Sequence, residues 1–179
     1  MTSIHVDEAY RVRVTKGGSI DSEGLIPLRM ALWQKGKELD HVTVVSGQPN
    51  RQNFRIATES HPGSMEPIPE GHYKVSGPFW ANGAGNFNDD WAPGLGPVVF
   101  DINNAPGNAT LRAELRIHQD SNEEISPGTA GCLGVQGEKG ERDFSKLKLI
   151  MKWFSDYKIV DLEIDYGLGS IASLCIPKK

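Results

Sequence analysis

Residues 109–135 read "ATLRAELRIHQDSNEEISPGTAGCLGV", and the first ten of them decide the fold class. Apolar and polar side chains alternate through this opening run, which is the pattern of a β-strand with one buried face. The expected apolar face consists of Leu111, Ala113, Leu115 and Ile117. His118 falls on the polar face, where the strand runs into a turn that contains several glycines. Similar runs recur along the chain, so the sequence predicts a mainly β protein.

Further strands are predicted on both sides of this stretch. They cover residues 10–16, two runs within 24–47 joined by a turn at Lys35-Gly36-Lys37, and residues 53–60, 72–77, 97–102, 158–167 and 170–177. One helix is expected late in the chain, within residues 140–157, with Asp143 as its N-cap. Its expected apolar face consists of Leu147, Ile150, Met151 and Phe154. This order predicts a β-sandwich or a β-barrel with a helix packed on it.

The size and charge of the chain indicate how many domains it has and which classes of protein it does not belong to. It has 179 residues, which fits a single domain over 1–179, and its net charge is −4. No basic run is present, so the electrostatic footprint of a nucleic-acid-binding protein is missing. No apolar run has the length of a membrane span. The N-terminus lacks the charged and apolar regions of a conventional secretory signal. The sequence therefore predicts neither nucleic-acid nor membrane-spanning partners.

Two cysteines occur, which is too few for a disulfide framework. Cys175 lies in an apolar run and is expected to pack there. Cys132 lies fourteen residues after His118, beside Gly131. A cysteine nucleophile needs a base that removes its proton, and backbone N–H groups that stabilise the oxyanion. The segment supplies each part, but a surface histidine near an unrelated turn cysteine fits the spacing as well.

The segment 118–132, "HQDSNEEISPGTAGC", resembles the signature of the L,D-transpeptidase catalytic domain. Upstream, "EPIPEGHYKVSG" at 66–77 resembles the strand entry of that family, and the likeness extends to Val135. The family has a histidine at the position of Ala130 and an arginine at that of Gly134. Divergent members, including secreted antibacterial effectors, resemble the shorter form found here. The resemblance implies a β-sandwich with one late helix.

The resemblance also implies roles. Cys132 is the expected nucleophile, His118 its base, and the backbone carbonyl of Gln119 the group that orients the imidazole. The N–H groups of Gly131 and Cys132 are the expected oxyanion donors. The residues expected to contact substrate are Tyr73, Trp80, Trp91, Asp120 and Thr129.

Three of these assignments leave alternatives open. Tyr73 fits the core as well as a cleft, and Asp120 fits a solvated loop acid. Residues 78–97 form a long aromatic loop, which either lines a site or folds over the sheet end. A zinc site built from His118, Asp120 and Cys132 lacks a fourth ligand at metal spacing, so no metal or other cofactor is expected.

The implied substrate is the peptidoglycan stem peptide, attacked through an acyl-enzyme on Cys132. Water as acceptor makes the protein an L,D-carboxypeptidase or endopeptidase, and an amine makes it a transpeptidase. With no export signal, we expect a monomer that is made in the cytoplasm and reaches the wall by lysis or non-classical export, as a phage lysin or an injected effector does. The alternative is a non-catalytic module that binds a peptide or a glycan.

Overall fold

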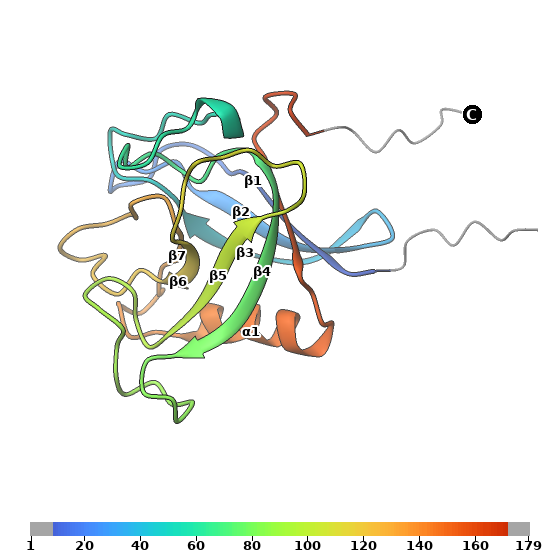
Figure 1. Cartoon of the computed structure of the whole chain (residues 1–179). Coiled ribbons are helices and arrows are strands. Elements are labelled where there is room, and N and C mark those ends of the chain that lie inside the picture. Colours follow the sequence, from blue (N-terminus) through green and yellow to red (C-terminus); the bar gives the residue numbers. More distant parts are fainter. Residues whose placement is uncertain (1–8, 172–179) are drawn as a thin grey trace, which may run out of the picture.

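The structure is a computed structural model that describes residues 9–171 (Figure 1). In that range the chain forms eight strands, one α-helix and one short 3₁₀ helix. In chain order these are β1 (Arg11–Lys16), β2 (Leu28–Gln34), β3 (Lys37–Val45), η1 (Ala57–Glu59), β4 (Gly71–Trp80), β5 (Val98–Asn104), β6 (Leu115–Gln119), β7 (Leu133–Val135), α1 (Ser145–Asp156) and β8 (Asp161–Asp165). The prediction of a mainly β fold with one late helix is confirmed.

The strands form one closed barrel in the order β1-β2-β3-β7-β6-β5-β4-β8. Two neighbouring pairs are parallel, β1 with β8 and β6 with β7. The remaining neighbours are antiparallel. The expected two-sheet sandwich is not confirmed, because β8 pairs with both β1 and β4 and thereby closes a single sheet on itself.

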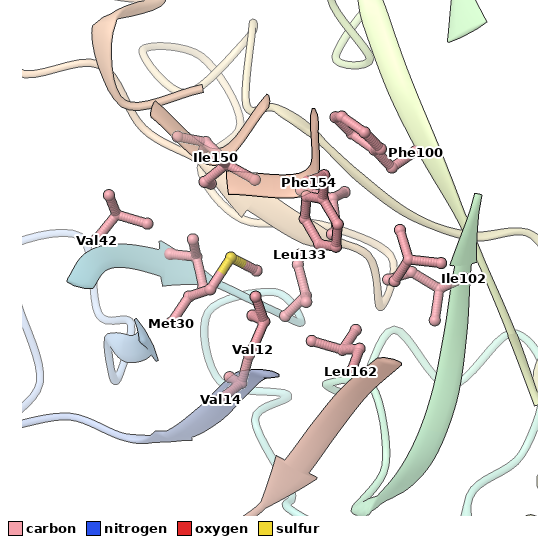
Figure 2. Packing of buried hydrophobic residues seen from close by; sticks show 14 of the residues in the cluster. Val12, Val14, Met30, Val42, Phe100, Ile102, Leu133, Ile150, Phe154 and Leu162 are labelled. Atoms are coloured by element: carbon pink, nitrogen blue, oxygen red, sulfur yellow. The ribbon is translucent and has the colours of Figure 1, made fainter. Parts of the chain in front are cut away.

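Alternate side chains of the strands fill the barrel interior (Figure 2). The helix α1 adds its own apolar face, formed by Leu147, Ile150, Trp153 and Phe154. Figure 2 shows Ile150 and Phe154 among the strand residues, and the rings of Phe154 and Phe100 lie 5.1 Å apart. Burial of each such side chain contributes about 1.5–3 kcal/mol. Met151 is only half-buried, so the predicted apolar face of the helix is rotated toward Trp153.

One local prediction agrees with the structure, and a second is displaced by one residue. The turn between β2 and β3 has φ angles of 51° at Lys35 and 72° at Gly36, which suit a two-residue hairpin turn. At the start of α1, Asp143 Oδ1 accepts a hydrogen bond of 3.1 Å from the Ser145 N–H. Asp143 therefore serves the first turn of the helix, although it lies one residue before the cap position at Phe144.

The strand predicted at 53–60 is wrong. Only Ile56 pairs there, in an isolated bridge with Glu70, and η1 follows at Ala57–Glu59. The side chains of Asn53 and Arg55 both turn to the carboxylate of Glu66, at 2.8–3.0 Å. These bonds bend the segment away from the regular ladder of a sheet.

The strand predicted at 109–118 begins only at Leu115. Glu114 has a φ of +56°, which interrupts the extended backbone, and the expected faces are exchanged before it. Leu111 is 75% exposed, whereas Arg112 is 8% exposed. The buried guanidinium of Arg112 finds acceptors inside the protein, and the chain bends to place it there.

The structure describes only the first two residues of the strand expected at 170–177. The rest of that strand, with Cys175, lies outside the described residues. Within residues 9–171, α1 is too short and too polar to cross a bilayer, and no other helix qualifies.

Candidate active site

His118 lies on β6, and Cys132 comes directly before the first residue of the neighbouring strand β7. The His118 residue is 4% exposed. The strands β6 and β7 run parallel, with Ile117 opposite Leu133 and His118 opposite Gly134. Ile117 and Leu133 are fully buried in the barrel interior. Because side chains alternate along a strand, the residues on either side of them face outward. Cys132 therefore comes opposite Arg116, diagonally next to His118, with no side chain at Gly134 between the strands.

The imidazole of His118 is held by the backbone. Its Nδ1–H donates a hydrogen bond of 2.7 Å to the carbonyl oxygen of Gln119, since a carbonyl can only accept. Burial lowers the pKa of His118 to about 4, and the charge of Arg116 acts in the same direction. Backbone interactions with Gln119 and Gly94 oppose this shift. The ring is therefore neutral at pH 7, and Nε2 is its basic nitrogen.

The Cys132 thiol lies near the N-terminal end of β6. Its Sγ–H donates to the carbonyl oxygen of Glu114 at 3.6 Å. Burial raises the pKa of the thiol, while the backbone and charge of Arg116 and the charge of Arg112 lower it. Among the described residues, no hydrogen bond joins the thiol to the His118 ring. The two side chains are thus neighbours on one face, and their pairing in catalysis stays a prediction.

Thr129 organises the turn that carries the cysteine. Its Oγ1 donates to the carbonyl oxygen of Cys132 at 2.6 Å and accepts from the N–H groups of Gly131 and Gly47 at 3.1 and 3.2 Å. Its side chain is buried, and its hydroxyl is engaged in these three hydrogen bonds, so contact of Thr129 with a substrate stays a prediction. The N–H of Gly131 is likewise engaged, which removes it as an oxyanion donor in this conformation. The amide of Cys132 is the remaining expected donor.

Arg112 lies beneath the same turn, and the sequence analysis missed it. Its Nη2 donates to the carbonyl oxygens of Ala130 at 2.8 Å and Glu66 at 3.2 Å. Its Nη1 reaches the hydroxyls of Ser60 and Ser64 and the carbonyl oxygen of Pro67 at 3.1–3.4 Å. Burial lowers the pKa of Arg112. Its N–H groups thus donate to neutral acceptors, and these bonds fix the path of the chain on both sides of the site.

The aromatic loop borders the His118 side of the site. A Cβ placed on Gly96 would lie 3.1 Å from Cβ of Gln119, so this end of the loop packs closely on the end of β6. Trp91 is 48% exposed, and its Nε1–H donates to the carbonyl oxygen of Phe79 at 3.1 Å. Trp80 is half-buried against Phe87. Part of the loop thus folds over the end of the sheet, which is one of the two roles that the sequence left open, and Trp91 is partly exposed. That the loop lines a site stays a prediction.

Two further expected substrate contacts lie inside the protein. Tyr73 is 1% exposed in the core, and its hydroxyl donates to the carbonyl oxygen of Pro69 at 2.7 Å. Burial raises the pKa of this phenol. Asp120 is fully buried, where its Oδ2 accepts from Gly128 N–H at 3.0 Å and Gln136 Nε2 at 3.3 Å. Tyr73 thus packs in the core, and Asp120 is not a solvated loop acid, while contact of either residue with a substrate stays a prediction.

Asp120 has an acidic neighbour that the sequence did not single out. Glu123 is 9% exposed, and its Oε2, like Oδ1 of Asp120, has no hydrogen-bond partner among the described residues. Burial raises the pKa of Asp120 to about 6 and that of Glu123 to about 7, and the charge of Asp120 adds to the second shift. Within residues 9–171, no three His, Cys, Asp or Glu side chains are grouped so that they could hold a metal ion.

No protein-family model and no curated protein matches the chain. Among solved structures, it is similar to the crystal structure of the helical cell shape determining protein Pgp2 from Campylobacter jejuni, with a TM-score of 0.46 and 12% identity. The match covers 89% of this chain and 49% of that one, so the chain spans about half the length of Pgp2. Similarity at this level carries no argument about activity.

Proposed function

We propose that this chain is a cysteine enzyme that acts on peptidoglycan stem peptides through an acyl-enzyme, as a divergent member of the L,D-transpeptidase family. The observation that carries the proposal is the placement of His118 and Cys132 on one face of adjacent strands, with Nδ1 bound to a carbonyl. This bond leaves Nε2 as the proton acceptor, which is the state that a general base needs.

The reaction begins when the Cys132 thiol leaves Glu114 and turns toward His118. Nε2 takes the thiol proton, and the thiolate attacks the peptide carbonyl carbon to form a tetrahedral oxyanion. The amide of Cys132 donates to this oxyanion. The C–N bond then breaks, and the amine leaves with the proton from His118. A thioester on Cys132 remains, which water or a second amine resolves with His118 again as the base.

The substrate class comes from the sequence resemblance over residues 67–135. The departures at Ala130 and Gly134 leave the base and the nucleophile of this scheme intact. A Cβ at Gly134 would approach Cγ2 of Thr129 at 2.7 Å, so the tight packing of the turn accounts for glycine here.

Incubation with defined muropeptides, followed by mass analysis of the products, tests this function. We expect loss of a terminal residue, cleavage of a crosslink or exchange by an added amine, and we expect Cys132→Ser and His118→Ala to abolish all of them. His72→Ala is the matched control, because its side chain is 55% exposed on β4, away from the site. Unchanged muropeptides with the wild-type protein contradict the proposal.

A binding module is the second candidate. It is favoured by the exposed Phe79 and Trp91 and by the missing hydrogen bond between the two site residues. In that case the protein binds muropeptides without converting them, and Trp91→Ala weakens binding whereas Cys132→Ser does not. The same incubation therefore separates the two candidates.

A further inference from the structure

Arg116 lies in a row of three side chains on the outer face of the barrel. It is the antiparallel partner of Asp101 on β5, and the β6–β7 register places Cys132 on its other side. The side chain of Arg116 is therefore next to the thiol. His118 lies two residues further along the same face of β6.

The guanidinium of Arg116 is only partly used. Its Nε donates to Oδ1 of Asp101 at 3.2 Å, and its side chain is 33% exposed. Among the described residues, its two terminal nitrogens have no acceptor. An arginine whose paired N–H donors face solvent can bind a planar carboxylate through two parallel hydrogen bonds.

The strand register places Arg116 near both site residues, and its charge acts on both of them. Arg116 lowers the pKa of Cys132 and also that of His118. An anion bound to Arg116 would consequently lie beside the carbonyl that Cys132 attacks. Arg112 cannot take this role, because its terminal nitrogens donate to acceptors inside the protein.

We propose that Arg116 binds a carboxylate of the acyl donor next to the scissile peptide bond, and so selects peptides that carry a free carboxylate there. This inference rests on the proposed function for the identity of the donor. Two carboxylates of a stem peptide fit the chemistry: the C-terminal carboxylate of the leaving residue, and the side-chain carboxylate of the residue that is acylated onto Cys132.

Three synthetic tetrapeptides test the proposal: L-Ala-γ-D-Glu-meso-diaminopimelate-D-Ala, its C-terminal amide, and the form amidated at the diaminopimelate side-chain carboxylate. A charge-assisted hydrogen-bond pair predicts that Arg116→Gln lowers kcat/KM for the free acid about 10- to 100-fold. Amidation of the carboxylate that Arg116 binds should lower kcat/KM of the wild-type protein by the same factor. With that amidated peptide, Arg116→Gln and the wild type should have equal kcat/KM. The peptide for which this occurs identifies the carboxylate.

Equal slowing of all three peptides by Arg116→Gln, or no slowing, overturns the proposal. Arg116→Lys, which keeps the charge and loses the two-pronged geometry, should retain part of the preference for the free acid. Arg29→Gln is the matched control, since Arg29 also lies on a strand in an exposed ion pair, with Glu38.

Binding to Cys132→Ser separates this inference from the proposed function. Calorimetry with the same peptides should give weaker binding when Arg116→Gln is added to that background, and only for peptides with the free carboxylate. If the wild-type protein shows no turnover but this dependence holds, the proposed function fails and the carboxylate site stands. If turnover occurs without the dependence, the carboxylate site fails alone.

Discussion

Nη2 of Arg112 donates a hydrogen bond of 2.8 Å to the carbonyl oxygen of Ala130, two residues before Cys132. The same nitrogen also reaches the carbonyl oxygen of Glu66. A Cβ added to Gly131 would lie 1.8 Å from this nitrogen, so the guanidinium presses directly on the turn. One buried side chain therefore joins the nucleophile turn to the segment that precedes β4.

Loss of Arg112 should destabilise the protein as well as the site. Arg112→Ala leaves several buried carbonyl oxygens without donors, and we expect the free energy of unfolding to fall by about 2–4 kcal/mol. Urea denaturation measures this change. Arg29→Ala removes an exposed ion pair and should cost less than about 1 kcal/mol. A similar loss of unfolding free energy in both variants would contradict the structural role of the buried Arg112 hydrogen bonds.

Gly131 should not tolerate a side chain. Its φ is +122°, a region that only glycine adopts readily, and the Cβ of alanine would also collide with Arg112. Gly131→Ala should lower the free energy of unfolding by about 1–3 kcal/mol or more. Gly18→Ala is the comparison, because nothing lies within 4 Å of its added Cβ. Thermal unfolding that shifts equally in the two variants would rule out this strain.

Asp120 and Glu123 should make the protein less stable as the pH rises. The folded state raises their pKa values to about 6 and about 7, so it holds protons that the unfolded chain releases near pH 4. Their contribution is complete below pH 4 and is lost as the pH passes through 6 to 7. Urea denaturation of Asp120→Asn between pH 4 and pH 8 should show a smaller decline than that of the wild type. Exposed Asp89→Asn should leave the decline unchanged.

His118 should act in the opposite direction. Its pKa is lowered to about 4 in the folded state, so the unfolded chain binds a proton at higher pH than the folded protein does. Stability is therefore lost as the pH falls from about 6.5, the ordinary value of histidine, through about 4. An NMR titration of the imidazole measures this directly. A midpoint for His118 near 6.5 would show that the ring is not buried as described.

The alternation of side chains explains why much of the fold could be predicted from sequence. It located most strands and placed His118 on the outward face of β6. Closure of the barrel could not be predicted, because it depends on β8 pairing with β1, about 150 residues earlier in the chain. The predicted assignment of residues to the buried and exposed faces was also wrong before Glu114. The positive φ of Glu114 exchanges the two faces, so Arg112 points inward.

The composition of the site was predicted better than its contacts. Local sequence indicates that a glycine turn carries Cys132, and the alternation of side chains puts His118 on the face of β6 that points away from the barrel interior. The sequence did not indicate that His118 is buried there, with only 4% of it exposed. The burial of Thr129 and Asp120 involves hydrogen-bond partners that are remote in sequence or lie across a folded loop, and Tyr73 is buried among core residues of distant strands. A polar residue near a nucleophile in the sequence can therefore stabilise the turn through internal hydrogen bonds as well as contact the substrate.

Mass spectrometry of the intact protein after incubation with a stem tetrapeptide or a carbapenem tests the central claim most directly. We predict one acyl adduct, located on Cys132 by peptide mapping, which is absent from Cys132→Ser and strongly reduced in His118→Ala while His72→Ala retains it. No adduct on the wild-type protein, or an adduct that forms at the same rate without His118, would contradict the assignment of these two residues as nucleophile and base.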